Sequence, residues 1–368
     1  MTLLSISELH KSFGDRPVLT GVSFQLRTGE KVGLIGPNGS GKTTLLRAIA
    51  GELPADSGEV RLSKQAGVGY LPQKPPVMGG ETLRRHLERA QKPLRKLEIE
   101  ISRLEREISS CPPAESTRLN RLLDRYGKIS VQFQQQGGYE LESRLQWVAL
   151  GLGFSHSDLD RELSRFSGGE KTRAQLAALL LQAPDLLMLD EPTNYLDQQG
   201  LEWLERYLID WPRSLIIVTH DRFFLDTVVG RILFLDRGSV KSYPGNYSSF
   251  YSLREQERLT QARAYTRQQK LIQKEEKLIR EAKADERSKR QASSRQKRLQ
   301  RITPLELPER KAGFRLDFNF RGRSGRRVIE FQGVTKRFGV RPLFENISFE
   351  VRWGDRVALI GPNGAGKT

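Results

Sequence analysis

The stretch Gly36-Pro37-Asn38-Gly39-Ser40-Gly41-Lys42-Thr43 decides the fold of this chain. It follows the apolar run Lys31–Ile35 and leads into Thr43–Ala50, which has helix-forming residues and stops at Gly51. A strand, a glycine-rich loop ending in Gly-Lys-Thr and a helix are together the parts of a phosphate-binding loop, or P-loop. A chance glycine-rich turn would not carry this context on both sides.

The residue types of this loop suit a nucleotide and its magnesium ion. Glycines let backbone amides close round the phosphate groups, the lysine reaches the β and γ oxygens, and the threonine hydroxyl ligates Mg²⁺. We therefore predict that the loop binds ATP and Mg²⁺. The predicted ATP-binding residues are Gly36, Asn38, Gly39, Ser40, Gly41, Lys42, Thr43 and Thr44, with Thr43 also a ligand of the metal ion.

Part of the sequence occurs twice. Lys11–Thr43 aligns without a gap to Lys336–Thr368 at an offset of 325, and 19 of these 33 positions are identical. The repeat predicts one whole domain, a linker and the opening of a second copy. We expect the chain to be a fragment of a longer protein, because the second copy stops before the helix whose N-terminal amides hold the phosphates. The second candidate ATP site comprises Gly361, Asn363, Gly364, Gly366, Lys367 and Thr368.

Two acids follow a short apolar run, Leu186–Leu189. Such a run reads as a buried strand of a largely parallel sheet, as does Leu215–Val218. The first acid, Asp190, is then placed to hold Mg²⁺, and Glu191 to act as general base on the attacking water. Acids at a strand end are often only solvated, but the P-loop upstream favours the catalytic interpretation.

A Ser-Gly-Gly turn precedes a helical run, Lys171–Gln182. The bare amides at a helix N-terminus attract anions, so Ser167, Gly168 and Gly169 are candidates for a second phosphate contact. A simple helix cap by Ser167 is the alternative, and it is favoured when the motif is considered alone. Strands that alternate with helices predict an α/β core.

Gln91–Gln136 departs from that alternation. Apolar residues recur there with 3-4 spacing in two runs, Leu94–Ile108 and Leu119–Phe133, on either side of Pro112-Pro113. This pattern predicts an antiparallel coiled-coil arm inserted at about residues 91–136. The alternative is a pair of ordinary core helices in a helical subdomain.

The basic charge of the chain is concentrated in one segment. The net charge is +17, and Arg254–Arg327 contributes 23 Lys and Arg against 10 Asp and Glu, a net of +13. Residues 249–301 have helix-forming composition without proline or glycine, and Ala284–Ser294 has the composition of a hairpin tip. A basic helical hairpin attracts phosphate backbones. The alternative is that this charged segment is only a solvated spacer between domains.

Nothing in the sequence indicates a membrane or secreted protein. The longest apolar stretch, Leu176–Leu189, is interrupted by polar residues and is shorter than the roughly 20 residues of a membrane helix. The N-terminus lacks a signal-peptide pattern, and the single cysteine, Cys111, cannot form an internal disulfide. We expect a cytoplasmic protein without a membrane partner.

The order of these motifs resembles the ATP-binding-cassette ATPase family. The residues that carry the resemblance are the P-loop, Gln73, Phe166–Glu170 (FSGGE), Leu186–Asp197 (LLMLDEPTNYLD) and Ile216–Asp221 (IIVTHD). In that family two domains enclose two nucleotides, and each P-loop faces the Ser-Gly-Gly of the partner. The resemblance implies that Phe13 stacks on adenine, that Gln73 senses Mg²⁺ and the γ-phosphate, and that His220 contacts the γ-phosphate. Without it, both Phe13 and His220 would be expected in the core.

Two positions depart from the commonest pattern of the family. The motif reads Phe-Ser-Gly-Gly-Glu in place of Leu-Ser-Gly-Gly-Gln, and Tyr195 stands where many relatives have histidine. The resemblance also implies that Asn194–Asp197 lies at the interface between cassettes. Neither departure removes a phosphate ligand.

Tandem cassettes with an arm and a basic linker resemble the F subfamily of this family. The matching linker residues are Lys289–Ala292 and Ser294–Leu299, together with Tyr243–Tyr247, which closes the first cassette. The resemblance implies that the linker and arm bind the ribosome and tRNA, and that the protein acts in translation as an ATPase. The alternatives are an ATPase subunit of a membrane transporter and a DNA-binding cassette ATPase.

The predicted architecture is an α/β P-loop NTPase of cassette type. It has a first cassette at residues 1–248, a basic helical-hairpin linker at 249–327, and the start of a second cassette at 328–368. The remainder of that second cassette is the expected intramolecular partner. For this chain by itself we expect ATP binding with little turnover, because neither composite ATP site is complete in it.

Overall fold

The computed structural model of the chain describes residues 1–64, 66–73, 79–112, 116–135, 137–283, 294, 296–299, 301, 325–338, 341–361 and 365–366. The chain forms two compact units. One unit comprises Met1–Tyr247 and Arg327–Thr368, and the other comprises Ser248–Arg326.

A six-stranded sheet is the centre of the first unit. Its strand order is β5-β6-β7-β3-β8-β9, with the first five strands parallel and the last antiparallel to β8. The strands are β3 (Lys31–Ile35), β5 (Val68–Leu71), β6 (Leu186–Asp190), β7 (Ser214–Val218), β8 (Arg231–Asp236) and β9 (Ser239–Pro244). Every residue of β6 and β7 is buried, because both faces of a parallel sheet are covered. The predicted α/β class and the predicted apolar strands are confirmed.

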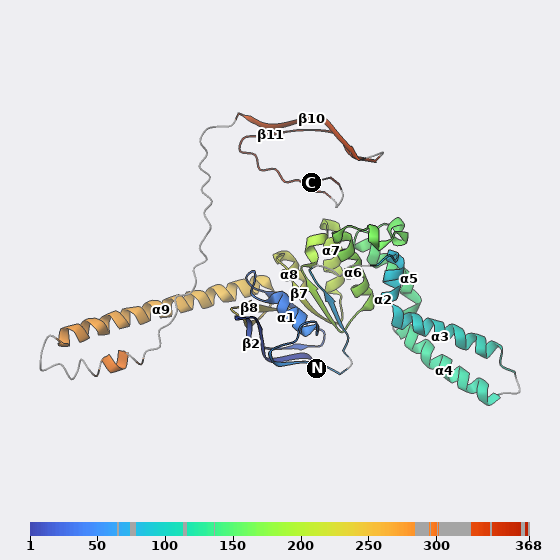
Figure 1. Cartoon of the computed structure of the whole chain (residues 1–368), viewed down its shortest axis with the longest axis horizontal. Helices are drawn as coiled ribbons and strands as arrows, with labels where there is room; N and C mark the ends of the chain where they lie inside the picture. Colours follow the sequence, from blue (N-terminus) through green and yellow to red (C-terminus); the bar gives the residue numbers. More distant parts are fainter. Residues whose placement is uncertain are drawn as a thin grey trace. The chain divides into compact units, whose positions relative to one another are not determined.

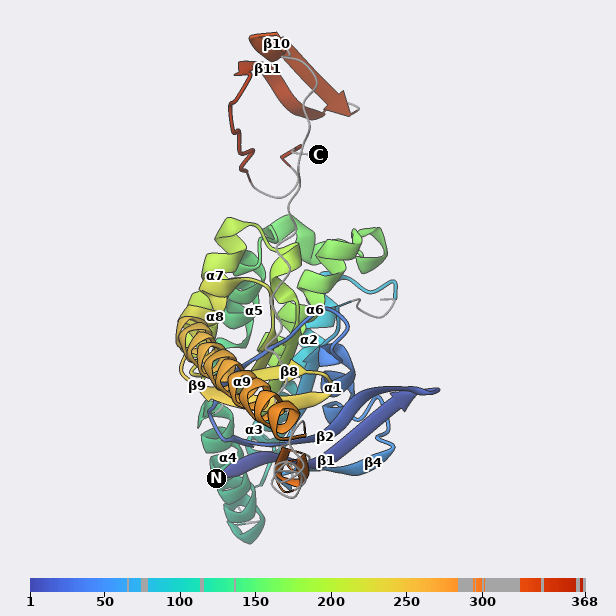
Figure 2. The same cartoon turned by 90° about the vertical axis from the view of Figure 1, so that its left-hand side faces the viewer.

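Helices cover this sheet and form a helical part beside it (Figures 1 and 2). The helix α6 contacts β5, α2 and α5, and α7 contacts α5 and α8. Their bounds are α1 (Lys42–Ile49), α2 (Leu83–Ala90), α5 (Leu141–Gly151), α6 (Gly168–Gln182), α7 (Gln198–Ile209) and α8 (Arg222–Val228). None of the helices in the described ranges combines the length and apolar character that crossing a membrane requires.

A smaller antiparallel sheet lies next to α1. Its order is β2-β1-β4, formed by β1 (Thr2–Phe13), β2 (Arg16–Arg27) and β4 (Ser57–Leu62). Buried side chains of this sheet, such as Leu4, share one hydrophobic cluster with Leu45 of α1 and Met188 of β6. The burial of this common core holds α1, and with it the P-loop, between the two sheets.

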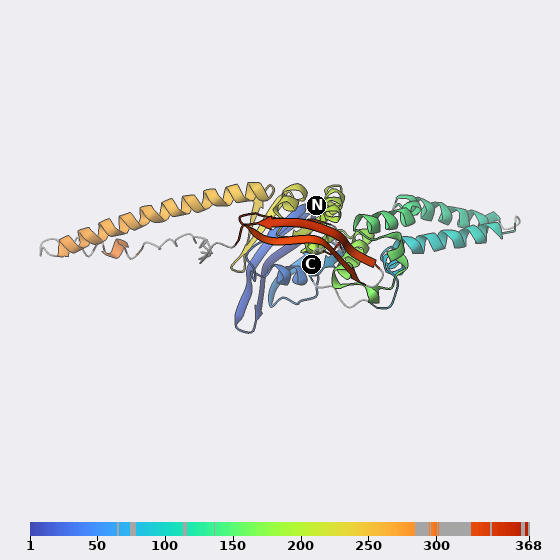
Figure 3. The same cartoon turned by 90° about the horizontal axis from the view of Figure 1, so that it is seen from above.

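The predicted arm is an antiparallel pair of helices, α3 (Lys92–Ser109) and α4 (Ser116–Gln135). It extends away from the helices that cover the sheet (Figures 1 and 3). Its seam consists of the apolar residues predicted from the 3-4 spacing, and the members that pack together are Leu94, Leu97, Ile101, Tyr126, Ile129 and Phe133, with Leu141 at the base. An ion pair of 2.6 Å between Arg125 and Glu100 joins the two helices.

The basic segment begins with one long helix, α9 (Tyr247–Lys283), of 37 residues. This helix confirms the prediction, made from composition, that the stretch is helical. Of its apolar residues, Ile279 is buried, whereas Leu271 is 50% exposed and does not belong to a buried stripe. Residues 284–293 of the predicted tip (284–294) and most of the predicted return half lie outside the described residues.

The hairpin β10 (Arg327–Phe338) and β11 (Arg341–Arg352) repeats the hairpin of β1 and β2. Each pair of its register is a β1–β2 pair displaced by 325 residues, as in Arg327 opposite Arg352 and Thr2 opposite Arg27. The irregularities of the register are repeated as well. The opening hairpin of the second copy therefore has the geometry of the first.

Candidate nucleotide-binding site

The P-loop runs from the end of β3 into α1, and two of its glycines have no room for a side chain. A Cβ added at Gly36 would lie 2.1 Å from the carbonyl oxygen of Leu235 on β8. Gly41 has φ +102°, and a Cβ there would lie 2.8 Å from Cγ1 of Val18. Backbone at these positions lies against its neighbours, which leaves the amide side of the loop to receive phosphate groups.

The Lys42 ammonium group lies over this loop. It donates hydrogen bonds of 3.0 Å to the carbonyl oxygens of Gly36 and Pro37. Burial lowers the pKa of Lys42, and the carboxylates of Glu191 and Asp190 oppose that shift. The ammonium group therefore lies between the loop carbonyls and the electrostatic influence of the acids at the end of β6, which suits a group that holds β and γ phosphates.

Thr43 and Asp190 form the predicted metal-binding pair. The hydroxyl of Thr43 donates a hydrogen bond of 2.7 Å to Oδ2 of Asp190, although 147 residues separate them. Asp190 is only 3% exposed, and burial raises its pKa while the Thr43 hydrogen bond and the Lys42 charge lower it. A hydroxyl and a carboxylate are hard oxygen ligands of the kind that Mg²⁺ prefers, so these residues fit the ion.

Glu191 is held in an unusual backbone conformation. It has φ 55° and ψ 51°, in the left-handed region, and its amide donates a hydrogen bond of 2.8 Å to the carbonyl of Val218 on β7. Strained backbone of this kind concentrates at functional sites. Burial raises the pKa of Glu191, and His220, whose Nε2 lies 3.4 Å from Oε1, lowers it. A carboxylate with a raised pKa is a better proton acceptor near neutral pH.

The link between Glu191 and His220 predicts a change in pH dependence. Glu191 acts as a base only when deprotonated, so turnover falls as the pH drops through its pKa. Because His220 lowers that pKa, the substitution His220→Gln should move the acid limb of the pH–rate profile to higher pH. The measurement is ATP turnover against pH at saturating ATP, for the parent and the variant in a longer chain that carries both cassettes. An unchanged or lower midpoint would show that the imidazole does not act on Glu191.

Phe13 and His220 are not core residues. Phe13 is 52% exposed at the β1–β2 turn, and the His220 side chain is 69% exposed after β7. The expectation that each, taken alone, would be packed in the core is therefore wrong. Both side chains are accessible to a ligand, and Phe13 lies on the hairpin whose Val18 packs against the P-loop.

Gln73 and Tyr195 are joined by a contact that the sequence did not indicate. The Tyr195 hydroxyl donates a hydrogen bond of 3.1 Å to the carbonyl oxygen of Gln73. The ring of Tyr195 also lies beside Gly169, where an added Cβ would be 3.4 Å from Cδ1. The departure at residue 195 therefore connects the exposed Gln73 to the start of α6.

Removing this hydroxyl tests whether the connection positions Gln73. We expect Tyr195→Phe to slow ATP turnover about two- to tenfold, since a hydrogen bond of this kind contributes about 1 kcal/mol. ATP affinity should stay unchanged, because neither atom belongs to the P-loop. Steady-state turnover of a longer chain that carries both cassettes and a separate nucleotide-binding titration measure the two effects. Tyr139→Phe, at an exposed tyrosine near the arm, is the control, and equal rates for all three proteins would exclude the positioning role.

The Ser-Gly-Gly motif caps α6. The Ser167 side chain accepts from the Glu170 amide at 3.3 Å, and the Glu170 carboxylate accepts from the Ser167 amide at 2.7 Å. Arg161 also donates to Glu170, at 3.1 Å, and its guanidinium stacks on Phe166 at 4.4 Å. The predicted cap is confirmed, and the glutamate of this variant motif acts in it.

The cap leaves the amide end of α6 open. Ser167 and Gly168 are exposed, and no atom of the described structure comes within 4 Å of a Cβ built on Gly168. The capping alternative and the anion-binding one are therefore compatible.

Of the second candidate ATP site, only Gly361 and Gly366 lie within the described residues. A Cβ at Gly366 would lie 2.6 Å from Cγ of Leu343, which corresponds to the approach of Gly41 to Val18 in the first copy. Asn363, Gly364, Lys367 and Thr368 lie outside the described residues.

Comparison with protein-family models gives two matches. Residues 19–194 match a model described as ABC transporter, and residues 233–317 match an extension model with the same description. The first match includes the P-loop, the Ser-Gly-Gly motif and both acids. The second includes the whole of α9.

Several of the similar proteins are described as ATP-binding proteins. An uncharacterized ABC transporter ATP-binding protein, YfmM of Bacillus subtilis (strain 168), is 35% identical over the whole chain, which covers 70% of it. The energy-dependent translational throttle protein EttA of Escherichia coli (strain K12) is 35% identical over 96% of the chain, which covers 62% of it. Among solved structures, an ATP binding subunit of an ABC transporter matches 66% of the chain and 90% of its own length, with TM-score 0.49 and 21% identity.

The chain thus spans between 57% and 70% of the length of its most similar curated relatives. Its match to YfmM extends over every motif described above, from the P-loop hairpin to the second copy. The chain belongs to the ABC transporter ATP-binding cassette family and carries the ATP-binding cassette of that family.

Proposed function

We propose that this protein is an F-subfamily ATPase that binds ATP with Mg²⁺ and acts on the ribosome and tRNA. The observation that carries the proposal is the basic helical segment after the cassette, which begins with the 37 residues of α9. The name of EttA, a translational throttle protein, supports the same assignment for a relative that is 35% identical. The proposed division of the chain is a cassette at 1–248, a linker at 249–327 and a second cassette from 328.

The proposed chemistry uses the residues that β3, β6 and β7 bring together. Thr43 and Asp190 would hold Mg²⁺, with Gln73 as a further contact, and the ion would supply positive charge that neutralises the phosphates. Lys42 and the loop amides orient the triphosphate. Glu191 accepts the proton of the attacking water while the bond to the leaving ADP breaks. Phe13 stacks on adenine, and His220 contacts the γ-phosphate.

Full turnover is proposed to need two cassettes. The Phe-Ser-Gly-Gly-Glu motif occurs once in this sequence, and its residues Ser167 and Gly168 are exposed, so we propose that this end of α6 contacts the P-loop of another cassette. A second cassette beginning at residue 328 would be the intramolecular partner. For this chain without such a partner we propose ATP binding with little turnover, and comparison with a longer chain that carries both cassettes tests this. Equal rates would contradict it.

The ribosome assignment predicts a steep dependence on salt. If about 6 to 10 cations of the basic segment meet phosphates, affinity should fall about 10³–10⁵-fold between 50 and 200 mM salt. Four exposed cations lie on α9 at helical spacing, namely Arg263, Arg267, Lys270 and Lys274. Replacing all four with glutamine should weaken binding. It should also reduce the slope of log affinity against log salt concentration by the contribution of about four released counterions.

Co-sedimentation with ribosomes, in the presence of a non-hydrolysable ATP analogue, measures this binding. The control protein replaces two exposed cations of the cassette, Arg61 and Lys64, and should sediment like the parent. Recovery with membranes and no ribosome signal would favour a transporter subunit. Tighter binding to duplex DNA than to ribosomes would favour the DNA-binding alternative.

A further inference from the structure

A pocket lined by aromatic side chains lies between α5 and α7, apart from the nucleotide site. Trp203 and Tyr207 are four residues apart and lie on one face of α7, and Trp211 follows two residues after the end of this helix. Their rings are 5.1 and 5.7 Å apart between successive centroids. Trp147 of α5 faces this row, at 5.1 Å from Trp203 and 5.5 Å from Tyr207.

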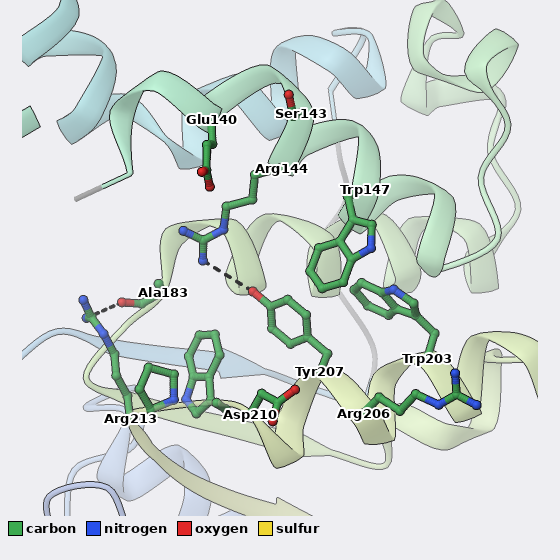
Figure 4. A pocket seen from close by; sticks show the side chains of 12 residues that line it. Glu140, Ser143, Arg144, Trp147, Ala183, Trp203, Arg206, Tyr207, Asp210 and Arg213 are labelled. Atoms are coloured by element: carbon green, nitrogen blue, oxygen red, sulfur yellow. Dashed lines mark hydrogen bonds between the residues drawn. The ribbon is translucent and has the colours of Figure 1, made fainter. Parts of the chain in front are cut away.

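The two helices approach closely because of one glycine. A Cβ built on Gly151 of α5 would lie 2.0 Å from Cε2 of Trp203. The ring of Trp203 therefore occupies the place of a side chain on α5. Figure 4 shows Arg144 and Trp147 directed from α5 toward Tyr207 and Trp203 of α7.

The aromatic side chains leave an open space beside them. A cavity of about 820 Å³ lies against these side chains, and Trp147 is 53% exposed although it has a large apolar ring. Cavities of 300 to 1,000 Å³ commonly take a single small ligand. The volume and the exposed ring of Trp147 together indicate space for one flat molecule.

The charges round this cavity favour an anion. Three guanidinium groups line it, from Arg144, Arg206 and Arg213, against two carboxylates, Glu140 and Asp210. Burial lowers the pKa of Lys31 on β3 and Asp210 opposes that shift, so the charge of Asp210 is partly matched by this cation.

The three arginines differ in the number and length of the hydrogen bonds and ion pairs that they make. Arg213 is held by Asp185 at 3.1 Å, and Arg144 makes long contacts of 3.4 Å to the Tyr207 hydroxyl and 3.5 Å to the Leu180 carbonyl. In the part of the chain that the structure describes, Arg206 is exposed and has no ion-pair partner. A cationic ligand would meet three like charges, whereas a phosphate would meet a free guanidinium.

We propose that this pocket binds one nucleotide, with its base stacked on the aromatic row and its phosphate on Arg206. Aromatic faces bind bases of any sequence, and guanidinium groups bind phosphate oxygens. The nucleotide is either a free mononucleotide or an unpaired residue of an RNA strand. The proposal does not depend on the ribosome assignment.

The position of three tryptophans makes the pocket directly observable. The chain has four tryptophans, and the fourth, Trp353, is 59% exposed on another part of the chain. In a Trp353→Phe, Lys42→Ala background, tryptophan emission therefore comes from the pocket, and nucleotide binding at the P-loop is weakened. Titration with AMP, the single-stranded oligonucleotide rA6 and duplex RNA should give saturable quenching with AMP, rA6 or both, and little with the duplex.

Two substitutions test the contacts. Trp147→Ala and Arg206→Glu, both at exposed positions, should each weaken the apparent Kd about tenfold or more, since stacking on one aromatic side chain contributes that much. Arg61→Ala, an exposed arginine of β4, should leave it unchanged, and circular dichroism checks that all three fold alike.

The outcomes separate the sources of the ligand. Quenching by AMP assigns the pocket to free nucleotide, and quenching by rA6 alone assigns it to RNA. The absence of binding to either, by quenching and by equilibrium dialysis, would overturn the proposal. So would unchanged affinity in both pocket variants, or saturable binding of an apolar peptide in place of the nucleotides.

Discussion

Replacing Glu191 with glutamine should abolish ATP turnover, by about 10²–10⁴-fold, while ATP binding stays intact. Glutamine keeps the size of the side chain but cannot accept the proton of the attacking water. The P-loop and the Thr43–Asp190 pair are not changed by this substitution, so the affinity for ATP depends on unaltered groups. Phosphate release under steady-state conditions, from a longer chain that carries both cassettes, and a fluorescent-ATP titration of the same chain measure the two quantities.

A matched carboxylate distinguishes this role from a general effect of charge. Burial also raises the pKa of Glu205 on α7, as do the neighbouring acids Asp221 and Glu202, and Glu205 lies outside the nucleotide site. Glu205→Gln should therefore leave turnover unchanged. A Glu191→Gln protein that turns over like the parent would remove Glu191 from the chemistry and leave it a structural residue in a strained turn.

Replacing Lys42 with alanine should weaken ATP binding itself, by about tenfold to a hundredfold. The ammonium group is already held over the loop by the Gly36 and Pro37 carbonyls, and it approaches both acids closely enough for them to raise its pKa. Its loss removes charge-assisted hydrogen bonds to the phosphates. Equilibrium titration of this chain with ATP and Mg²⁺ gives the affinity without any need for turnover.

Two further variants sharpen that test. Lys64→Ala, at an exposed lysine outside the site, should bind ATP like the parent. Lys42→Arg keeps the charge but changes the shape of the donor group, so it should recover only part of the affinity. Equal ATP affinity in the alanine variant and the parent would show that the loop amides alone hold the triphosphate.

Much of the fold follows from local pattern. Leu186–Leu189 and Leu215–Val218 are uninterrupted apolar runs, and only a strand covered on both faces requires them. The arm follows from 3-4 spacing, and its seam contains the expected residues. The order of the strands does not follow, since β7 pairs with β3 across more than 180 residues of chain and no local pattern encodes that choice.

The residues of the nucleotide site could be predicted from the sequence, but the contacts between them could not. Motifs identified Thr43, Asp190 and Glu191, while the 2.7 Å hydrogen bond between Thr43 and Asp190 and the left-handed turn at Glu191 depend on the packed sheet. The bond from Tyr195 to Gln73 spans 122 residues and gave no signal beyond an unusual residue in a familiar motif.

The aromatic pocket was missed although part of it is visible in the sequence. Trp203, Tyr207 and Trp211 have helical spacing, which could have identified one aromatic face. Trp147 lies more than 50 residues upstream, and a glycine on its own helix admits the opposing ring. Such a site requires two helices to meet, so spacing along one of them describes only half of it.

The two hairpins of the chain have the same register but carry different residues at their left-handed positions. At the first left-handed position β1 has Glu8 and β10 has Gly333, and at the second β2 has Gly21 and β11 has Asn346. In both copies a serine hydroxyl, of Ser23 or Ser348, accepts the amide of the first of these residues at 2.8 Å. The bend is thus specified by a side-chain acceptor on the opposite strand rather than by glycine. Exchanging the hairpins between the two copies should therefore preserve their shape. Each hairpin should then be able to replace the other in a chimeric chain.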